Sequence, residues 1–356
     1  MKKKILISTG GSGGHVIPAT IFYEHLKKNF DVSIASDKRG IKFLDKSKYD
    51  IKIINTPKLT QNLFLLPYKL FVIVFLIIKS TFFLKSKQID IMISTGGYMS
   101  LPLCIASKIL NIKIFLFEPN MVLGRANKLF LRFSEKIFCY SDKIKNFPNN
   151  LSSKITLIPA LLRKEFYNIE KSSDLNKEIN LLIIGGSQGA KLFDTAIKDT
   201  IVKLSKKYKL KIFQQTSFKN YKNLKSFYLK NDIENELFDF SEDISYFMSQ
   251  ANICVTRAGA STLGELTFLN IPYLAVPYPF AKDDHQFQNA LFYKNINCCW
   301  ILRQEDLKND VLFDNLTNII SNKEDYLIKK NNMKKFSYKN TWNNINQKLI
   351  RIINEN

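Results

Sequence analysis

Short apolar runs, each ended by glycine or polar residues, recur along the first part of the chain. They cover residues 4–8, 31–36, 90–94 and 113–117, and longer stretches of helical length separate them. Buried strands that alternate with helices are typical of a parallel sheet with crossover helices. This pattern predicts an α/β domain.

The same pattern restarts further along, with apolar runs at residues 180–184, 211–214, 253–256 and 271–276. Each half therefore opens with an apolar strand, a Gly-Gly-Ser loop and a helix, which indicates a duplicated architecture. Between the halves, residues 159–174 lose periodicity and turn polar. We expect domains at 1–160 and 161–339, and a helix at 340–356 that packs back on the first domain.

Length and composition agree with two globular domains but add an excess of positive charge. The 356 residues contain 53 Lys and Arg against 31 Asp and Glu, a formal net charge of +22. Such a chain is attracted to anionic lipid, nucleic acid or phosphorylated substrates, although biased composition is an equal explanation. No basic run is concentrated enough for a nucleic-acid arm, so nucleic acid is not expected as a partner.

The cysteines and the N-terminal residues indicate whether the protein binds a metal ion and in which compartment it resides. The five cysteines lack framework spacing, and no C-x-x-C pair offers ligands for zinc, so no metal is expected. The apolar run after the N-terminal lysines stops at Ser8, which is too short for a signal peptide. These features predict an intracellular protein.

Glycine-rich loops follow several of the predicted strands. GGSGGH at residues 10–15 and GGSQG at 185–189 each lead into a helix, and Gly96 and Gly97 follow a third strand. Glycines allow close backbone approach, and helix N-termini attract anions. The first loop fails the G-x-G-x-x-G spacing at Val16, and the second lacks a P-loop ending, so neither a dinucleotide fingerprint nor an ATPase is expected. Two such loops on two similar domains predict one ligand held from both sides.

A fourth glycine-rich stretch, TRAGASTLGE at residues 256–265, has two interpretations. Ser261 or Thr262 caps the following helix with Glu265 in its first turn, or Glu265 accepts hydrogen bonds from ribose hydroxyls. A polar cluster, DDHQFQNA at 283–290, opens a further helix.

These motifs in this order resemble the MurG family of peptidoglycan glycosyltransferases. The resemblance rests on GGSGGH, GGY, EPN, GGSQGA, TRAGAST-x-x-E and DHQ-x-x-NA, and it covers residues 5–301. It implies the GT-B architecture, with two Rossmann-like domains facing a deep cleft. It also implies inverting transfer of N-acetylglucosamine from UDP-GlcNAc to an undecaprenyl-linked muramyl-pentapeptide, without metal or cofactor, at the cytoplasmic face of the bacterial inner membrane.

The resemblance also implies roles for residues at matching positions. The donor would be bound by Ser12, Gly13, Gly14, Asn120, Arg163, Ser187, Ser241, Ala260, Ser261, Thr262, Leu263, Gly264, Glu265 and Gln286, and the acceptor diphosphate by Gly96, Gly97 and Tyr98. The chain departs from the family at residues 117–119, where Phe-Glu-Pro replaces His-Glu-Gln. It departs again before Arg163, where Gly-Asn-Pro-Val is usual. The second departure weakens the assignment of Arg163.

The implied reaction needs a base for the attacking hydroxyl and N–H donors for the departing diphosphate. His15 is the first candidate for the base because it closes a ligand-facing glycine loop, and Glu118 is the second. Positioning of the sugar or phosphate is the other role open to His15.

The most apolar stretch, residues 63–84, is interrupted by Lys69 and Lys79. A spanning helix needs roughly 20 apolar residues. We expect a helix partly inserted in an anionic membrane surface through Leu63 to Lys87, with its lysines near lipid phosphates. A wholly buried crossover helix and a transmembrane span are the alternatives.

Other functions remain open from sequence alone. They are another GT-B transferase acting on a different lipid acceptor, a UDP-sugar epimerase of related architecture, and a nucleotide-binding regulatory module. The polar cluster at 283–290 argues against the last of these.

Overall fold

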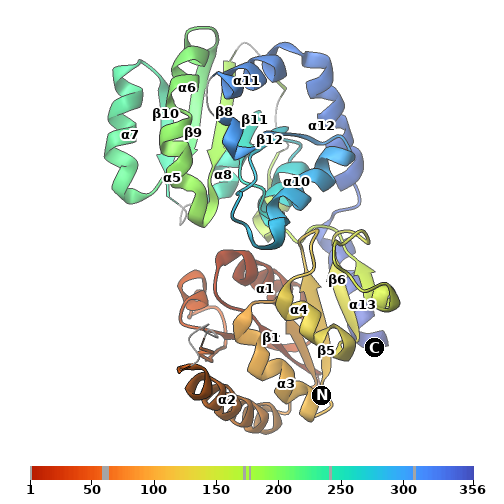
Figure 1. Cartoon of the computed structure of the whole chain (residues 1–356). Coiled ribbons are helices and arrows are strands. Elements are labelled where there is room, and N and C mark those ends of the chain that lie inside the picture. The colour runs from red at the N-terminus through yellow and green to blue at the C-terminus, as the bar shows by residue number, and fades with distance from the viewer. Residues whose placement is uncertain (1, 58–63, 171–173, 176–177, 240–242, 308–309) are drawn as a thin grey trace. The chain divides into compact units, whose positions relative to one another are not determined.

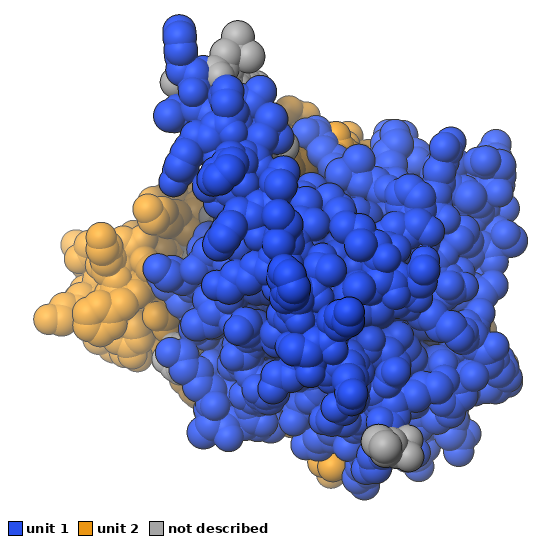
Figure 2. Space-filling view, turned by 90° about the horizontal axis from the view of Figure 1, so that it is seen from below, with its two compact units in different colours: residues 1–163, 341–356 blue, residues 164–340 orange. Residues whose placement is uncertain are grey.

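The computed structural model describes residues 2–57, 64–170, 174–175, 178–239, 243–307 and 310–356, and the side chains of 187–190 are not described. The chain divides into two compact units, Met1–Arg163 with Thr341–Asn356, and Lys164–Asn340. Figure 2 colours the two units separately. The predicted cleft between the domains stays a prediction.

Unit 1 contains a seven-stranded, fully parallel sheet in the order β3-β2-β1-β4-β5-β6-β7. Its strands are β1 (Lys4–Ser8), β2 (Asp31–Ser36), β3 (Ile51–Ile53), β4 (Ile91–Ser94), β5 (Lys113–Glu118), β6 (Lys136–Cys139) and β7 (Ile155–Leu157). Its helices are α1 (Gly13–Leu26), α2 (Leu66–Lys87), α3 (Leu101–Ile109), α4 (Arg125–Phe130) and α13 (Trp342–Glu355).

Unit 2 repeats this plan with six parallel strands in the order β10-β9-β8-β11-β12-β13. The strands are β8 (Glu178–Ile184), β9 (Lys209–Gln215), β10 (Glu234–Phe238), β11 (Ile253–Thr256), β12 (Tyr273–Ala275) and β13 (Cys299–Ile301). The helices are α5 (Gly186–Ala196), α6 (Lys198–Ser205), α7 (Phe218–Lys230), α8 (Ile244–Gln250), α9 (Ala260–Phe268), α10 (His285–Asn295), α11 (Val311–Ser321) and α12 (Lys323–Ser337).

Short 3₁₀ helices occupy several connections, and η2 and η6 lie beside predicted site residues. They are η1 (Gly40–Phe43), η2 (Tyr98–Ser100), η3 (Leu131–Phe133), η4 (Asn149–Lys154), η5 (Lys164–Asn168), η6 (Lys282–Asp284) and η7 (Gln304–Leu307).

The two parallel sheets confirm the predicted α/β class with two Rossmann-like domains.

The first strand of each sheet in chain order lies in the sheet interior and is covered on both faces, as its apolar sequence predicts. In β1, Ile5, Leu6 and Ile7 are fully buried, and in β8 the run Leu181 to Ile183 is equally inaccessible. In both sheets the strand order reverses beside this first strand, between β1 and β4 and between β8 and β11. Loops at the carboxyl ends of strands that flank such a reversal are where open α/β sheets bind ligands.

The last helix, α13, belongs to unit 1 and lies among its elements in Figure 1. Its Trp342 stacks on His25 of α1, with ring centroids 3.7 Å apart. His25 is 1% exposed, and burial lowers its pKa to about 4. The neutral imidazole therefore behaves as an aromatic surface for α13 at physiological pH.

Helix α2 is largely exposed despite its apolar sequence. Within it only Ile73, Ser80 and Leu84 are buried. The exposed apolar side chains are Tyr68, Leu70, Phe71, Val74, Phe75, Ile78 and Phe82. The alternative of a wholly buried crossover helix is therefore wrong: only one edge of α2 packs on the unit. Leu63 lies outside the described residues.

Candidate functional site

Two glycine loops meet where the strand order of unit 1 reverses. One follows β1 and the other follows β4, and β1 pairs with β4 directly. Gly11 and Gly96 have φ of +86° and +88°, a backbone region that L side chains rarely adopt. A Cβ atom on Gly96 would lie 3.3 Å from Cε1 of His15. Glycine at position 96 thus lets the second loop lie against the histidine of the first.

His15, in the first turn of α1, is half-buried between these loops. Its Nδ1 lies 2.8 Å from the carbonyl oxygen of Thr95. A carbonyl only accepts hydrogen bonds, so Nδ1 must carry the proton in this contact. In the neutral ring Nε2 is then the basic nitrogen. The contact holds the imidazole in the tautomer that a general base at Nε2 requires.

Ser12 is the N-cap residue of α1, and its side chain makes no capping hydrogen bond. Gly13 and Gly14 form the first turn, and Gly14 is exposed. The start of α1 therefore offers backbone N–H groups beside His15, an arrangement that suits an anion.

Glu118 ends β5 and is 3% exposed. Its Oε1 accepts from the backbone N–H (3.2 Å) and the side-chain amide (3.0 Å) of Asn120. Its Oε2 accepts from the N–H of Gly124 at 2.7 Å and from Nδ2 of Asn127 at 3.0 Å. Four donors thus surround one buried carboxylate. This geometry fits a residue that orders the loop after β5 better than a base that must receive a proton.

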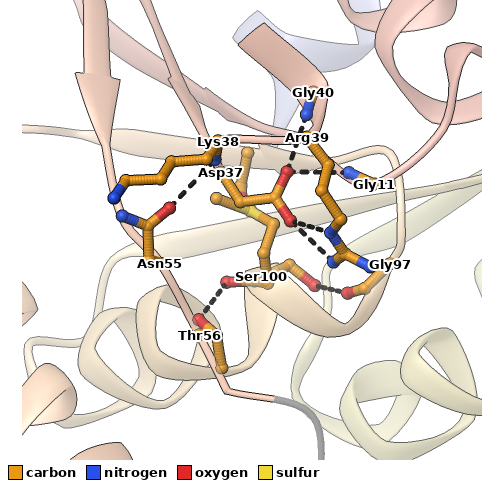
Figure 3. Close-up of polar contacts among 11 residues, drawn as sticks. Gly11, Asp37, Lys38, Arg39, Gly40, Asn55, Thr56, Gly97 and Ser100 are labelled. Atoms are coloured by element: carbon orange, nitrogen blue, oxygen red, sulfur yellow. Dashed lines mark hydrogen bonds and ion pairs between the residues drawn. The ribbon is translucent and has the colours of Figure 1, made fainter. Parts of the chain in front are cut away.

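Asp37, directly after β2, holds the first glycine loop in place and was not singled out from the sequence. Its Oδ1 accepts from the N–H groups of Gly11 (2.9 Å) and Gly40 (2.8 Å), as Figure 3 shows. Burial by itself would raise the pKa of Asp37. The hydrogen bonds from Gly11, Gly40 and Arg39 outweigh burial and lower that pKa below its usual value. The signal was its place at the carboxyl end of a strand.

Arg163 and Tyr98 are half-buried residues of unit 1. Tyr98 opens η2 directly after Gly97, whose φ is +87°. Arg163 follows the fully buried Leu162 and is the last residue of the first segment of unit 1.

In unit 2, α5 starts within the glycine loop that follows β8. Gly186 has φ of +65°, and its N–H donates to Oε1 of Gln215 at 2.8 Å. This bond fixes the loop to the end of the neighbouring strand β9. The side chain of Ser187 and all of Ser241 lie outside the described residues.

The helix after β11 begins earlier than the capping interpretation predicts. Gly259 is the N-cap residue of α9, and no side chain caps the helix. Ser261 and Thr262 lie inside the first turn, half-buried, and Glu265 lies beyond that turn and is 6% exposed. The prediction of a Ser/Thr cap with Glu265 in the first turn is therefore wrong. Glycine supplies the extended N-cap backbone, which leaves both hydroxyls free of that role.

Leu263 and Gly264 of α9 are buried, and the side chain of Leu263 is fully inaccessible. Ala260 opens the helix and is half-buried. Ala260, Leu263 and Gly264 therefore have only backbone groups to offer a ligand.

Polar side chains from α10 hold the loop in front of α9. Gln286 Oε1 accepts from the N–H groups of Ala258 (3.2 Å) and Tyr278 (3.0 Å), and Asn289 Nδ2 donates to the Ala258 carbonyl at 3.1 Å. The carbonyl half of Gln286 is thus structural, while its amide nitrogen is the half that can donate to a sugar.

Arg257, between β11 and this loop, is 6% exposed. It donates to the carbonyl oxygens of Val276 (3.1 Å) and Pro277 (3.3 Å) and to Oε1 of Gln304 (2.6 Å). Burial lowers its pKa to about 10, so it stays cationic at neutral pH. The loop in front of α9 therefore lies beside a fixed positive charge.

The described residues offer no cluster of metal ligands. In this part of the chain no three His, Cys, Asp or Glu side chains lie close enough to hold a metal ion. All five cysteines are buried and unpaired with one another, and burial raises the pKa of Cys104 to about 12.

Comparison with known proteins matches both halves of the chain. Residues 5–139 match the glycosyltransferase family 28 N-terminal domain, and residues 180–347 match the C-terminal domain of that family. A UDP-N-acetylglucosamine--N-acetylmuramyl-(pentapeptide) pyrophosphoryl-undecaprenol N-acetylglucosamine transferase from Pelagibacter ubique is 57% identical, with both chains fully covered. A Rickettsia felis protein of the same name is 32% identical over 90% of this chain and 91% of its own.

Two solved structures share the fold. The crystal structure of Acinetobacter baumannii MurG has a TM-score of 0.76 at 22% identity, covering 99% of this chain and 100% of its own. A UDP-GlcNAc 2-epimerase from Neisseria meningitidis, bound to UDP-GlcNAc, has a TM-score of 0.65 at 16% identity with the same coverage. Transferases and epimerases thus share this architecture, so the fold alone does not separate them.

Proposed function

The chain belongs to glycosyltransferase family 28, and from that premise we propose that it transfers N-acetylglucosamine from UDP-GlcNAc to an undecaprenyl-linked muramyl-pentapeptide in peptidoglycan synthesis. The observation that carries this proposal is the 57% identity to the Pelagibacter transferase over the full length of both chains. The paired glycine loops at the strand reversals of both sheets support it, because they supply backbone donors for anionic substrates.

In the proposed reaction the acceptor hydroxyl attacks the anomeric carbon of the donor sugar. Nε2 of His15 accepts the hydroxyl proton, a new glycosidic bond forms with inversion, and the bond to UDP breaks. Thr95 supports this role because its carbonyl keeps the proton of the neutral ring on Nδ1. Glu118 is a positioning residue for the loop that carries Asn120.

The donor is assigned to the residues that the family resemblance implies. They are Ser12, Gly13, Gly14, Asn120, Arg163, Ser187, Ser241, Ala260, Ser261, Thr262, Leu263, Gly264, Glu265 and Gln286. The start of α9 supports binding of the leaving diphosphate, because its N–H groups are uncapped by side chains. Glu265 accepts hydrogen bonds from the ribose in this proposal.

The acceptor is assigned to unit 1, with its diphosphate at Gly96, Gly97 and Tyr98. Positive φ at both glycines supports a close approach of phosphate oxygens to the backbone. In this proposal unit 2 (Lys164–Asn340) binds the nucleotide and unit 1 binds the acceptor.

The fold comparisons raise an epimerase as the alternative function. An assay with UDP-GlcNAc as the only substrate distinguishes an epimerase from a transferase. Incubated with labelled UDP-GlcNAc and no acceptor, the protein is expected to return the donor sugar unchanged, since the acceptor hydroxyl that attacks it is absent. Chromatography of the nucleotide sugars checks this. Accumulation of an isomeric UDP-sugar would instead establish an epimerase.

The proposed membrane surface is the exposed stripe of α2. Tyr68, Phe71, Phe75, Ile78 and Phe82 recur at helical spacing, and Phe71 and Phe82 are 71% and 70% exposed. The helix is long and apolar enough to cross a membrane by length and composition, but Lys69 and Lys79 interrupt it and one edge packs on unit 1. An interfacial helix with Lys69, Lys79, Lys85 and Lys87 near lipid phosphates fits these facts. The enzyme would then be peripheral on the cytoplasmic face of the bacterial inner membrane, where its lipid-linked acceptor lies.

Replacing Phe71 and Phe75 together with serine tests this surface. Each exposed phenylalanine contributes about 1.5 kcal/mol or more when buried in lipid, so affinity for anionic vesicles is expected to fall at least tenfold. Co-sedimentation at low salt measures it, with Phe218→Ser in α7, 85% exposed, as the matched control. Unchanged vesicle binding by the double variant would rule out α2 as the membrane surface.

A further inference from the structure

An open pocket lies beside the first glycine loop, at the carboxyl ends of β2 and β3. It has a volume of roughly 380 Å³ and is lined by Asp37, Lys38, Arg39, Asn55 and Thr56. This volume lies within the range of small-ligand pockets. Neither the donor residues nor the acceptor glycines assigned above line it.

The guanidinium of Arg39 is held in one orientation at this cavity. Its Nε and Nη2 donate to Asp37 Oδ2 at 2.8 and 2.6 Å, and Asp37 is itself fixed by the Gly11 and Gly40 amides (Figure 3). The Arg39 side chain nevertheless stays 46% exposed. Part of a pre-oriented cation therefore faces solvent, where it can bind an anion without a large entropy cost.

The charges and hydrogen-bonding groups of the cavity favour an anionic, amide-rich ligand. Lys38 and Arg39 place two cations against the single carboxylate of Asp37. Oδ1 of Asn55 accepts from the Lys38 N–H at 2.9 Å, which orients the Asn55 amide at the cavity. A ligand carboxylate can form an ion pair with the excess positive charge. Peptide N–H and C=O groups of the ligand can form hydrogen bonds with the Asn55 and Thr56 side chains.

The cavity is tied to both glycine loops of the proposed acceptor site. The Gly11 amide donates to Asp37 in the cavity wall, and Thr56 Oγ1 donates to the carbonyl of Met99, in η2 after Gly97, at 3.3 Å. Nη2 of Arg39 lies 3.9 Å from where a Cβ on Gly11 would be. A ligand group in the cavity is therefore a direct neighbour of the loop that carries His15.

We propose that this cavity binds a carboxylate of the acceptor's peptide, with Arg39 and Lys38 as its specificity-determining residues. The inference rests on the proposed function. The acceptor carries two kinds of anion, the diphosphate and the peptide carboxylates, both attached to the same muramyl sugar. The diphosphate is assigned to the glycine backbone, whereas fixed guanidinium and amide groups in a wider cavity suit a peptide with its carboxylate.

The test compares three short-chain lipid-linked acceptors: one with the full pentapeptide, one with the same peptide fully amidated at its carboxylates, and one without peptide. Arg39→Gln is expected to raise KM for the full acceptor about tenfold, the loss of one charge-assisted hydrogen bond, and to leave KM for the other two nearly unchanged. Lys38→Gln should act in the same direction. Lys46→Gln, which removes an exposed cation of the same unit, is the matched control.

In Arg39→Gln, Asp37 loses its ion pair but keeps its two backbone donors, so the variant is expected to fold with a lower Tm. An unchanged KM for UDP-GlcNAc verifies that its site is intact. An equal rise in KM for all three acceptors would assign the charge to the diphosphate and overturn the proposal. No change with any acceptor would overturn it too. If the unmodified protein transfers sugar to none of the acceptors, the proposed function itself has failed, which is a separate result.

Discussion

Replacing His15 with glutamine is expected to lower kcat on the order of a thousandfold, the usual effect of losing a general base. The imidazole is already oriented for this task, since its Nδ1 faces the Thr95 carbonyl at 2.8 Å and leaves Nε2 as the basic nitrogen. Glutamine retains polarity at the site but cannot take up a proton. Steady-state kinetics with both substrates saturating measures the change.

KM for UDP-GlcNAc should change little in His15→Gln, because proton removal belongs to the transition state rather than to donor binding. His15→Ala serves as a second variant, since it removes any hydrogen bond that glutamine preserves. A role in positioning sugar or phosphate would appear as a higher KM with kcat largely kept. Nearly full turnover in both variants would exclude His15 as the base.

Glu118→Gln is expected to lower the free energy of unfolding by about 3 kcal/mol, as when one partner of a buried charged network is lost. All four donors around the carboxylate, from Asn120, Gly124 and Asn127, point at oxygen atoms. An amide group must place its NH₂ against two of them. The loop after β5 should loosen, and kcat should fall together with stability.

Turnover of the folded variant distinguishes this positioning role from catalysis by Glu118 itself. A positioning role predicts that part of kcat is kept at temperatures at which Glu118→Gln is fully folded. If Glu118 were the base, glutamine would abolish turnover at those temperatures as well. Denaturant unfolding establishes the folded fraction, with the exposed Glu135→Gln as the control for removing one negative charge from unit 1.

Much of the fold was predictable because buried central strands have unmistakable sequences. The boundaries of β1, β2 and β11 were predicted to the residue. In β1 and β11 the reason is a short apolar run buried on both faces, whereas in β2 apolar and polar residues alternate at first. The strands not identified include β3, β7 and β13, which have three residues each and lie at sheet edges. A half-exposed strand of that length is too short to show a periodic pattern.

The glycine loops of the site could also be identified from the sequence, because backbone positions with positive φ favour glycine. The residues that hold these loops were not. Asp37, Asn127 and the carbonyl of Thr95 act through contacts to residues distant in sequence or through the backbone. The start of the helix after β11 was predicted wrongly for a related reason. A glycine N-cap has no side chain that marks it in the sequence, so the N-cap was assigned to Ser261 or Thr262.

Radiolabelled UDP-GlcNAc gives a direct assay of sugar transfer to a lipid-linked acceptor. With undecaprenyl-linked muramyl-pentapeptide present, label is expected to move into the lipid fraction, with one UDP released for each sugar transferred. Without that acceptor neither should occur. Label that stays on the nucleotide in the presence of the acceptor would show that the protein does not catalyse this transfer.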